Sequence, residues 1–159
     1  MKVIFLDIDG VLNTPSSESR CGEYIGIDDD KVERLKQIVE KTKAEIVLIS
    51  TWKKYWRKED KLKPLQDYSA NYLDEKLAKQ GLKAIDKTKD KADGRYLSRG
   101  EGILEYVYRN NVEKYIILDD CQFDYDGCYL TDCLIKTKQG EGLTKAQAEN
   151  ACEILLKQL

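Results

Sequence analysis

The chain has 159 residues, of which 42% are hydrophobic and 35% are charged, and its formal net charge is −2. This composition is too apolar for a disordered chain, and the length suits one domain with one core, which we place over residues 1–159. The longest apolar runs are no longer than strands and no basic, apolar leader precedes the first, so we expect a cytoplasmic protein with no membrane partner.

The hydrophobic pattern predicts strands and helices that alternate along the chain. In the first half of the chain we expect a buried strand at 2–8, an amphipathic helix at 29–43, a buried strand at 45–50 and two helical pieces in 52–80 around Pro64. A weak strand at 82–85, a polar loop at 86–98, a helix at 100–110, a strand at 114–118 and a short strand at 134–138 should follow. The last element should be a helix to about 156 that begins with the capping box of Thr144 and Gln147. In the helix at 100–110, Ile103, Leu104 and Val107 should face inward. This alternation predicts a three-layer, Rossmann-like α/β fold, in which helices cover both faces of a parallel sheet.

Polar residues follow three of the predicted strands. Asp7 and Asp9 come after the first strand, Ser50 after the second, and Asp119 and Asp120 after the strand at 114–118. In a parallel sheet, ligands bind beyond the carboxyl ends of the strands, so these side chains should lie close together. Clustered carboxylates repel one another unless a cation is present, and Mg²⁺ prefers carboxylate and phosphate oxygens. We therefore predict a magnesium site at this edge of the sheet.

The five cysteines are odd in number and irregularly spaced, which argues against a disulfide framework and for a reducing compartment. Three of them, Cys121, Cys128 and Cys133, lie close together in the sequence. Because the chain has no histidine and no CxxC pair, we expect buried core residues here rather than a zinc site.

Basic residues are concentrated in the middle of the chain, where residues 53–99 carry 14 basic and 8 acidic side chains. This region is either a surface that faces the substrate or a set of solvated helix faces. It begins with aromatic and basic residues in alternation, and we predict that Thr51, Trp52, Lys53 and Lys54 bind substrate, since aromatic faces stack on bases and lysines neutralise phosphates. The alternative is an amphipathic helix that buries Trp52 and Trp56.

Four short motifs in this order resemble those of haloacid dehalogenase (HAD)-type phosphatases. FLDIDGVLN at 5–13 matches the first motif, Ser50 the second, Arg99 the third, and the acidic run from Asp119 to Asp124 the fourth. More narrowly, LDIDGVLN, IST-W, RGEGI, ILDD and GLT are similar to the HAD domain of Swiss-army-knife RNA repair proteins. The resemblance spans almost the whole chain.

The resemblance implies roles for individual residues. Asp7 would be the nucleophile that forms an aspartyl-phosphate, and Asp9 would be the general acid and base. Ser50 would bind the phosphoryl oxygens, with Thr51 as the second choice for that position. Arg99 would neutralise the phosphoryl charge, although lysine is commoner in the family and Arg95 is a rival.

The resemblance also implies the ligands of a Mg²⁺ cofactor. They would be Asp7, the backbone carbonyl of Asp9 and one carboxylate of the fourth motif, for which we favour Asp120. Asp119 would then be a neighbouring partner, and Asp124 completes the acidic cluster.

Family members select substrates through inserted cap domains. Residues 14–28 leave room only for a flap, and part of 52–98 must supply core elements, so we expect no full cap domain and an open site. An open site suits large substrates such as a polynucleotide end or a protein. We expect a phosphohydrolase that acts on phosphorylated RNA or DNA ends or on nucleotides. The alternatives are a phosphatase of small metabolites and a non-catalytic nucleic-acid-binding module. The sequence gives no indication of the oligomeric state.

Overall fold

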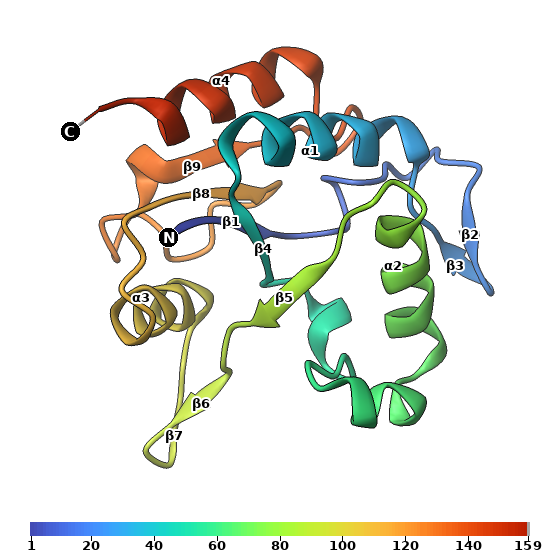
Figure 1. Ribbon diagram of the computed structural model, residues 1–159, viewed down its shortest axis with the longest axis horizontal. Coiled ribbons are helices and arrows are strands. Elements are labelled where there is room, and N and C mark those ends of the chain that lie inside the picture. Colours follow the sequence, from blue (N-terminus) through green and yellow to red (C-terminus); the bar gives the residue numbers. More distant parts are fainter. Residues whose placement is uncertain (159) are drawn as a thin grey trace.

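The computed structural model describes residues 1–158 and places a five-stranded sheet between layers of helices (Figure 1). The sheet order is β5-β4-β1-β8-β9, and every neighbouring pair is parallel. The strands are β1 (Lys2–Leu6), β4 (Glu45–Leu48), β5 (Ala84–Lys87), β8 (Lys114–Asp119) and β9 (Leu134–Lys136). Leu6 pairs with Leu48 on one side and with Leu118 on the other, so the three central strands end at the same level.

Helices cover both faces of the sheet, which confirms the predicted three-layer α/β fold. Helices α1 (Asp29–Thr42) and α4 (Lys145–Leu156) lie together over one face, and α3 (Arg99–Arg109) lies under the other (Figure 1). Side chains of β1 alternate between two hydrophobic cores, as a strand requires. Ile4 and Leu6 belong to the core of α1 and α4, whereas Val3 and Phe5 pack with α3. The remaining α-helix, α2 (Tyr68–Ala78), contributes Leu73 to the core that α1 and α4 cover.

The helix ends follow local capping chemistry. Thr144 and Gln147 form the predicted capping box of α4, and Ser98 and Glu101 form a second one that starts α3 at Arg99. One expectation for α3 was wrong, because Leu104 is 40% exposed while Tyr106 takes the inward position. The buried face of α3 therefore includes Ile103 and Tyr106 rather than Ile103 and Leu104.

Two segments differ from the sequence prediction. In residues 52–80 the second of the two expected helical pieces is present as α2, but the part before it contains only short 3₁₀ turns, Thr51–Lys53 and Asp60–Leu65. The loop expected at 86–98 contains the hairpin of β6 (Lys91–Ala92) and β7 (Arg95–Tyr96). Its turn residues, Asp93 and Gly94, both have positive φ, as a type I′ turn requires.

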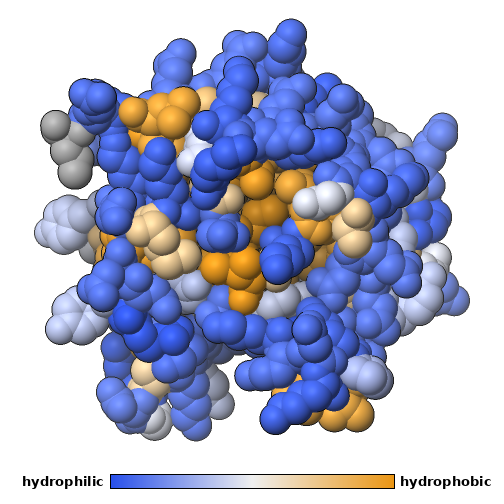
Figure 2. Space-filling view, in the orientation of Figure 1, coloured by the Kyte–Doolittle hydropathy of each residue, from blue (hydrophilic) through white to orange (hydrophobic). Residues whose placement is uncertain are grey.

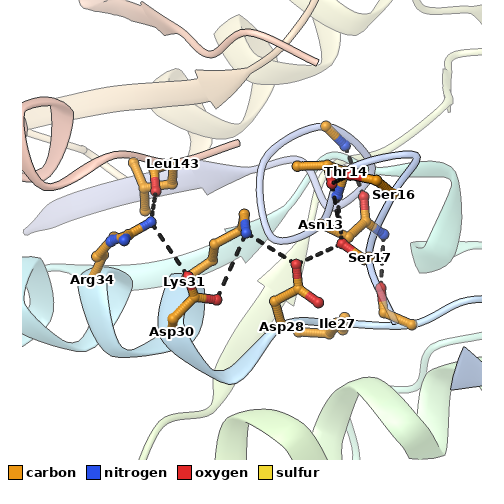
Figure 3. A network of polar contacts seen from close by, with 12 residues as sticks. Asn13, Thr14, Ser16, Ser17, Ile27, Asp28, Asp30, Lys31, Arg34 and Leu143 are labelled. Carbon is orange, nitrogen blue, oxygen red and sulfur yellow. Dashed lines mark hydrogen bonds and ion pairs between the residues drawn. The ribbon is translucent and has the colours of Figure 1, made fainter. Parts of the chain in front are cut away.

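The insertion after the first motif is a hairpin rather than a cap domain. Its strands, β2 (Arg20–Cys21) and β3 (Tyr24–Ile25), lie beside α2 at the edge of the molecule (Figure 1). The base of the hairpin is tied to the start of α1, where the Asp28 carboxylate accepts hydrogen bonds from Ser17 Oγ at 2.6 Å and Lys31 Nζ at 3.0 Å (Figure 3). The hairpin therefore projects from a rigid base next to the carboxyl end of β1.

No helix within residues 1–158 is both long enough and apolar enough to cross a membrane. On the face shown in Figure 2 most of the surface is hydrophilic, and hydrophobic residues are confined mainly to a hollowed central area. All five cysteines are free thiols. Cys121 is exposed and Cys128 and Cys133 are partly buried, so the expectation that these three are buried core residues was wrong.

Candidate active site

Asp7 lies directly beyond the central strand. Its backbone N–H continues the sheet ladder by donating to Leu118 O at 2.9 Å, and its side chain is only 9% exposed. The chain then turns at Gly10, which has φ 81°. A side chain at Gly10 would overlap the carboxylate of Asp120, so the turn brings the first and fourth motifs into direct contact.

Arg99, the first residue of α3, joins two of the predicted carboxylates. Its Nη1 lies 3.4 Å from Oδ1 of Asp7 and donates to Oδ2 of Asp119 at 2.9 Å. The rival base, Arg95, instead pairs with Glu101 on the β6–β7 side of the molecule and is exposed. The structure therefore places Arg99, and not Arg95, beside the predicted nucleophile.

Two aromatic side chains hold this arrangement, and sequence reasoning did not find either of them. Tyr125 donates its hydroxyl proton to Asp119 Oδ2 at 2.6 Å, and the Phe123 ring lies 4.1 Å from the Arg99 guanidinium. Phe123 lies within the fourth motif and Tyr125 directly after it, but the motif is defined by its acidic residues. The Tyr125 hydroxyl holds the Asp119 carboxylate, and the Phe123 ring packs against the guanidinium that this carboxylate binds.

The electrostatics of the site are dominated by an excess of carboxylates. Burial, followed by the neighbouring charge of Asp119, raises the pKa of Asp7 to about 7, although Arg99 acts in the opposite direction. Asp120 adds a further increase. One guanidinium therefore does not neutralise the three carboxylates, and the site favours binding of a cation.

The ligand atoms of Asp119, Asp120 and Cys121 all lie within 4.8 Å of one another. Asp119 is fully buried, and Arg99, Tyr125 and the Cys121 backbone N–H donate to its oxygens. Asp120 is partly exposed and lies against Gly10. Of the two carboxylates, Asp120 is therefore the one with fewer protein partners and more exposure, and the preference for it as a metal ligand stays a prediction.

Asp124 has different partners from Asp119 and Asp120. Its carboxylate accepts hydrogen bonds from Gly100 N at 3.0 Å, from Ser98 Oγ and from Cys128 Sγ at 3.4 Å. Although burial acts in the opposite direction, the bonds from Ser98 and Gly100 lower the pKa of Asp124. Asp124 anchors the N-terminus of α3, and with it Arg99, rather than joining the cluster of Asp119 and Asp120.

The second motif also differs from the expected arrangement. Ser50 is 1% exposed, and its Oγ accepts a hydrogen bond of 3.2 Å from the backbone N–H of Trp52, which caps the 3₁₀ turn. Thr51 is exposed and lines the cavities on both sides of the site. The structure thus gives the open position to Thr51, which the sequence analysis ranks second.

Asp9 is exposed and is held from two sides. Trp52 Nε1 donates to its Oδ2 and Asn13 Nδ2 donates to its Oδ1, both at 3.0 Å. Asn13 also bonds to Gly10 N and Gly26 O, so it links the motif to the base of the hairpin. Sequence reasoning missed Asn13, although it stands within the first motif.

Two cavities flank the site. The larger, of about 600 Å³, is lined by Asp9, Cys21, Glu23, Tyr24, Ile25, Thr51, Trp52 and Ser69. The smaller, of about 370 Å³, is lined by Ile49, Thr51, Lys53, Lys54, Thr88, Lys89, Asp90, Ser98 and Arg99. The first is mostly apolar with two carboxylates, and the second is basic.

The residues predicted to bind substrate divide into two groups. Thr51, Trp52 and Lys54 line the cavities and are at least partly exposed. Lys53 also lines the smaller cavity, but it is buried, and it donates to Thr88 O at 2.9 Å and pairs with Asp90 at 2.7 Å. Burial lowers the pKa of Lys53, against the opposing effect of Asp90. Lys53 therefore ties the 3₁₀ turn to the segment after β5, and its contact with substrate stays a prediction. Trp56 is also in the core, as the alternative interpretation expected.

The chain has no match among curated proteins. A family model does match, over residues 3–148, and it describes the HAD domain in Swiss Army Knife RNA repair proteins. The match includes every residue of the site described above. Together with the parallel sheet and the motifs at its carboxyl edge, it shows that the chain belongs to this family of HAD domains.

Proposed function

We propose that the protein is a Mg²⁺-dependent phosphohydrolase that acts through an aspartyl-phosphate on Asp7. The observation that supports this most strongly is the arrangement in which Arg99 contacts both Asp7 and Asp119 at the carboxyl end of the central strands. A guanidinium at this position can neutralise a phosphoryl group that is transferred to Asp7. Asp9 stands two residues away and opens into a cavity of suitable size for a substrate.

The reaction has two steps. In the first, a carboxylate oxygen of Asp7 attacks phosphorus, the bond from phosphorus to the leaving oxygen breaks, and Asp9 gives that oxygen its proton. In the second, Asp9 takes a proton from a water molecule, which attacks phosphorus and releases inorganic phosphate and Asp7. Trp52 and Asn13 hold the Asp9 carboxylate for both transfers.

The residues present fit a magnesium ion. The donor set consists of carboxylate oxygens, and the raised pKa of Asp7 reflects a surplus of negative charge that a cation would relieve. Asp7, the Asp9 backbone carbonyl and Asp120 would hold the ion, with Asp119 alongside. When bound, it supplies positive charge to the nucleophile and the phosphoryl oxygens.

We further propose that the substrate is a phosphorylated nucleic-acid end or a nucleotide. The family is named for RNA repair proteins, and the insertion after the first motif is a short hairpin that leaves the site open. Lys54 and Lys89 line the basic cavity beside Arg99, where they could neutralise further phosphates. The alternative of a small-metabolite phosphatase makes less use of this basic surface.

The test is phosphate release from p-nitrophenyl phosphate and from 3′- and 5′-phosphorylated oligonucleotides, with Mg²⁺ and with chelator. Wild type and Asp132→Asn, a matched change at an exposed position, should be active with Mg²⁺, and Asp7→Asn should be inactive. Acid quenching with ³²P-labelled substrate should trap label on the wild-type protein but not on Asp7→Asn. Turnover in Asp7→Asn, or none in wild type with any of these substrates, would contradict the proposal.

A further inference from the structure

The larger cavity is enclosed by the β2–β3 hairpin on one side and by the 3₁₀ turn and α2 on the other. It is lined by two aromatic rings, those of Tyr24 in the hairpin and Trp52 in the turn, and also by Cys21 and Ile25. Figure 1 shows the hairpin and α2 side by side at the edge of the molecule. A volume of about 600 Å³ is ample for one nucleoside and lies within the usual range of small-molecule sites.

The position of Asp9 decides which part of a substrate enters this cavity. A general acid must reach the oxygen that leaves phosphorus. Asp9 lines the larger cavity, whereas the smaller one is lined by Arg99 and does not include Asp9. If the proposed function holds, the leaving group must therefore lie between the hairpin and Trp52.

The charges that line the two cavities differ in sign. The larger cavity includes the carboxylates of Asp9 and Glu23 and no lysine or arginine. A leaving group with further negative charge would be repelled there, whereas a neutral ring would gain contact with the aromatic walls. The basic residues that would attract phosphates are gathered in the smaller cavity.

We infer that the larger cavity is a nucleobase subsite, in which the base of the leaving nucleoside stacks between Tyr24 and Trp52. This inference rests on the proposed phosphohydrolase function and specifies the substrate class of that site. The indole of Trp52 is fixed by its bond to Asp9, so the ring face is in place before a substrate arrives. Tyr24 lines the same cavity from a hairpin whose two-residue turn is made possible by Gly22, which has φ 61°.

Tyr24 allows a clean test, because its side chain is 77% exposed and its removal disturbs no core. The experiment compares kcat/KM for 5′-AMP with that for ribose 5-phosphate, which is an ester of the same hydroxyl group but lacks the base. Stacking on an aromatic wall should favour AMP by about 5- to 100-fold in wild type. Tyr24→Ala should lower this ratio at least fivefold, mainly through KM for AMP, and Tyr24→Phe should restore it. 3′-AMP is measured in parallel with the same variants.

The matched control is Tyr108→Ala, which removes another highly exposed tyrosine, from α3 and outside both cavities. It should keep the wild-type ratio. Two results would overturn the subsite: a ratio of kcat/KM for AMP to kcat/KM for ribose 5-phosphate near one in wild type, or a ratio that Tyr24→Ala leaves at the wild-type value. In either case, turnover of p-nitrophenyl phosphate would still support the proposed phosphohydrolase activity. Absence of turnover with every substrate would overturn the proposed function and the subsite together.

Discussion

The indole nitrogen of Trp52 donates a hydrogen bond of 3.0 Å to Oδ2 of Asp9, and so connects the second motif to the first across the mouth of the site. The opposite oxygen of the same carboxylate accepts from Asn13. Trp52 itself packs against Tyr72 of α2, with ring centroids 6.3 Å apart. An exposed carboxylate that would otherwise rotate is thereby held in one orientation.

This relationship predicts that Trp52→Phe impairs proton transfer while it keeps an aromatic ring in the wall. A hydrogen bond to a charged group contributes about 1.5–3 kcal/mol, so kcat/KM for an alkyl phosphate should fall by about 10- to 100-fold. The loss should be much smaller with p-nitrophenyl phosphate, because its leaving group hardly needs a proton. Steady-state kinetics with both substrates measures the difference.

Trp56→Phe is the control for that experiment. Trp56 is in the same segment and donates its indole N–H to Asp74 at 2.8 Å, away from Asp9. Trp56→Phe should lower the stability of the protein without changing how kcat/KM depends on the leaving group. Equal losses on both substrates in Trp52→Phe would show that the indole does not position Asp9.

Arg99 and Arg95 give a second prediction. Arg99→Ala should lower kcat/KM by about 10²- to 10³-fold, since it removes the cation between Asp7 and Asp119 and leaves Asp119 buried without its charged partner. Arg99→Lys should recover part of the activity, because lysine keeps the charge but not the fixed guanidinium geometry. Arg95→Ala should remain within about twofold of wild type, because Arg95 is an exposed partner of Glu101. Comparable losses in Arg95→Ala and Arg99→Ala would contradict this assignment.

The raised pKa of Asp7 predicts an effect on stability that runs opposite to the effect on activity. With the metal chelated, the folded protein keeps a proton on Asp7 up to about pH 7, whereas the unfolded chain loses it near the ordinary value of 3.8. The folded state therefore binds more protons between these two values, and stability falls as the pH rises through that window. Asp7→Asn removes this decline and should be more stable than wild type by about 1–3 kcal/mol at pH 7–8.

Thermal unfolding of both proteins in EDTA, from pH 4.5 to pH 8, measures this difference. The advantage of Asp7→Asn should grow up to about pH 7 and then level off, and Mg²⁺ should reduce it by stabilising the wild type selectively. A difference between the two proteins that is independent of pH would show that Asp7 does not carry a raised pKa.

The sequence was sufficient to predict the sheet and its polar edge, for a physical reason. Buried parallel strands are continuous apolar runs, and the residue at which such a run stops marks the carboxyl end, where Asp7 and Asp119 stand. In a parallel sheet the carboxyl ends of neighbouring strands lie at the same edge, whatever the conformation of the loops. Their positions thus followed from local pattern and fold class alone.

The features of the site that the sequence did not indicate depend on contacts between distant segments. Whether Asp124 binds a metal or caps α3 depends on Ser98 and Gly100, which lie more than 20 residues earlier. From the sequence alone Lys53 resembles an exposed surface lysine, but in the structure its ammonium group contacts Thr88 and Asp90. No local pattern contains that information. The hairpin at Asp93 and Gly94, by contrast, carried a recognisable Asp-Gly signal.

Ser50 and Thr51 provide the last prediction, because the structure gives their neighbouring hydroxyls different surroundings. The Ser50 hydroxyl caps the 3₁₀ turn that carries Trp52, whereas Thr51 borders both cavities. Thr51→Val keeps the shape of the side chain and removes the hydroxyl, so kcat/KM should fall by about 10-fold through the loss of a bond to the phosphoryl oxygens. Ser50→Ala should instead cost about 1 kcal/mol of stability, as the loss of a capping hydroxyl does.

Kinetics and thermal unfolding of both variants separate the two roles. Ser50→Ala can also lower activity indirectly, since a loosened turn would release Trp52 from Asp9; that loss would show the leaving-group dependence of Trp52→Phe. A uniform loss on every substrate in Ser50→Ala, with wild-type stability and a fully active Thr51→Val, would instead return the phosphoryl contact to Ser50. The buried hydroxyl would then donate its proton to a phosphoryl oxygen, while its oxygen still accepts the hydrogen bond from the Trp52 backbone N–H.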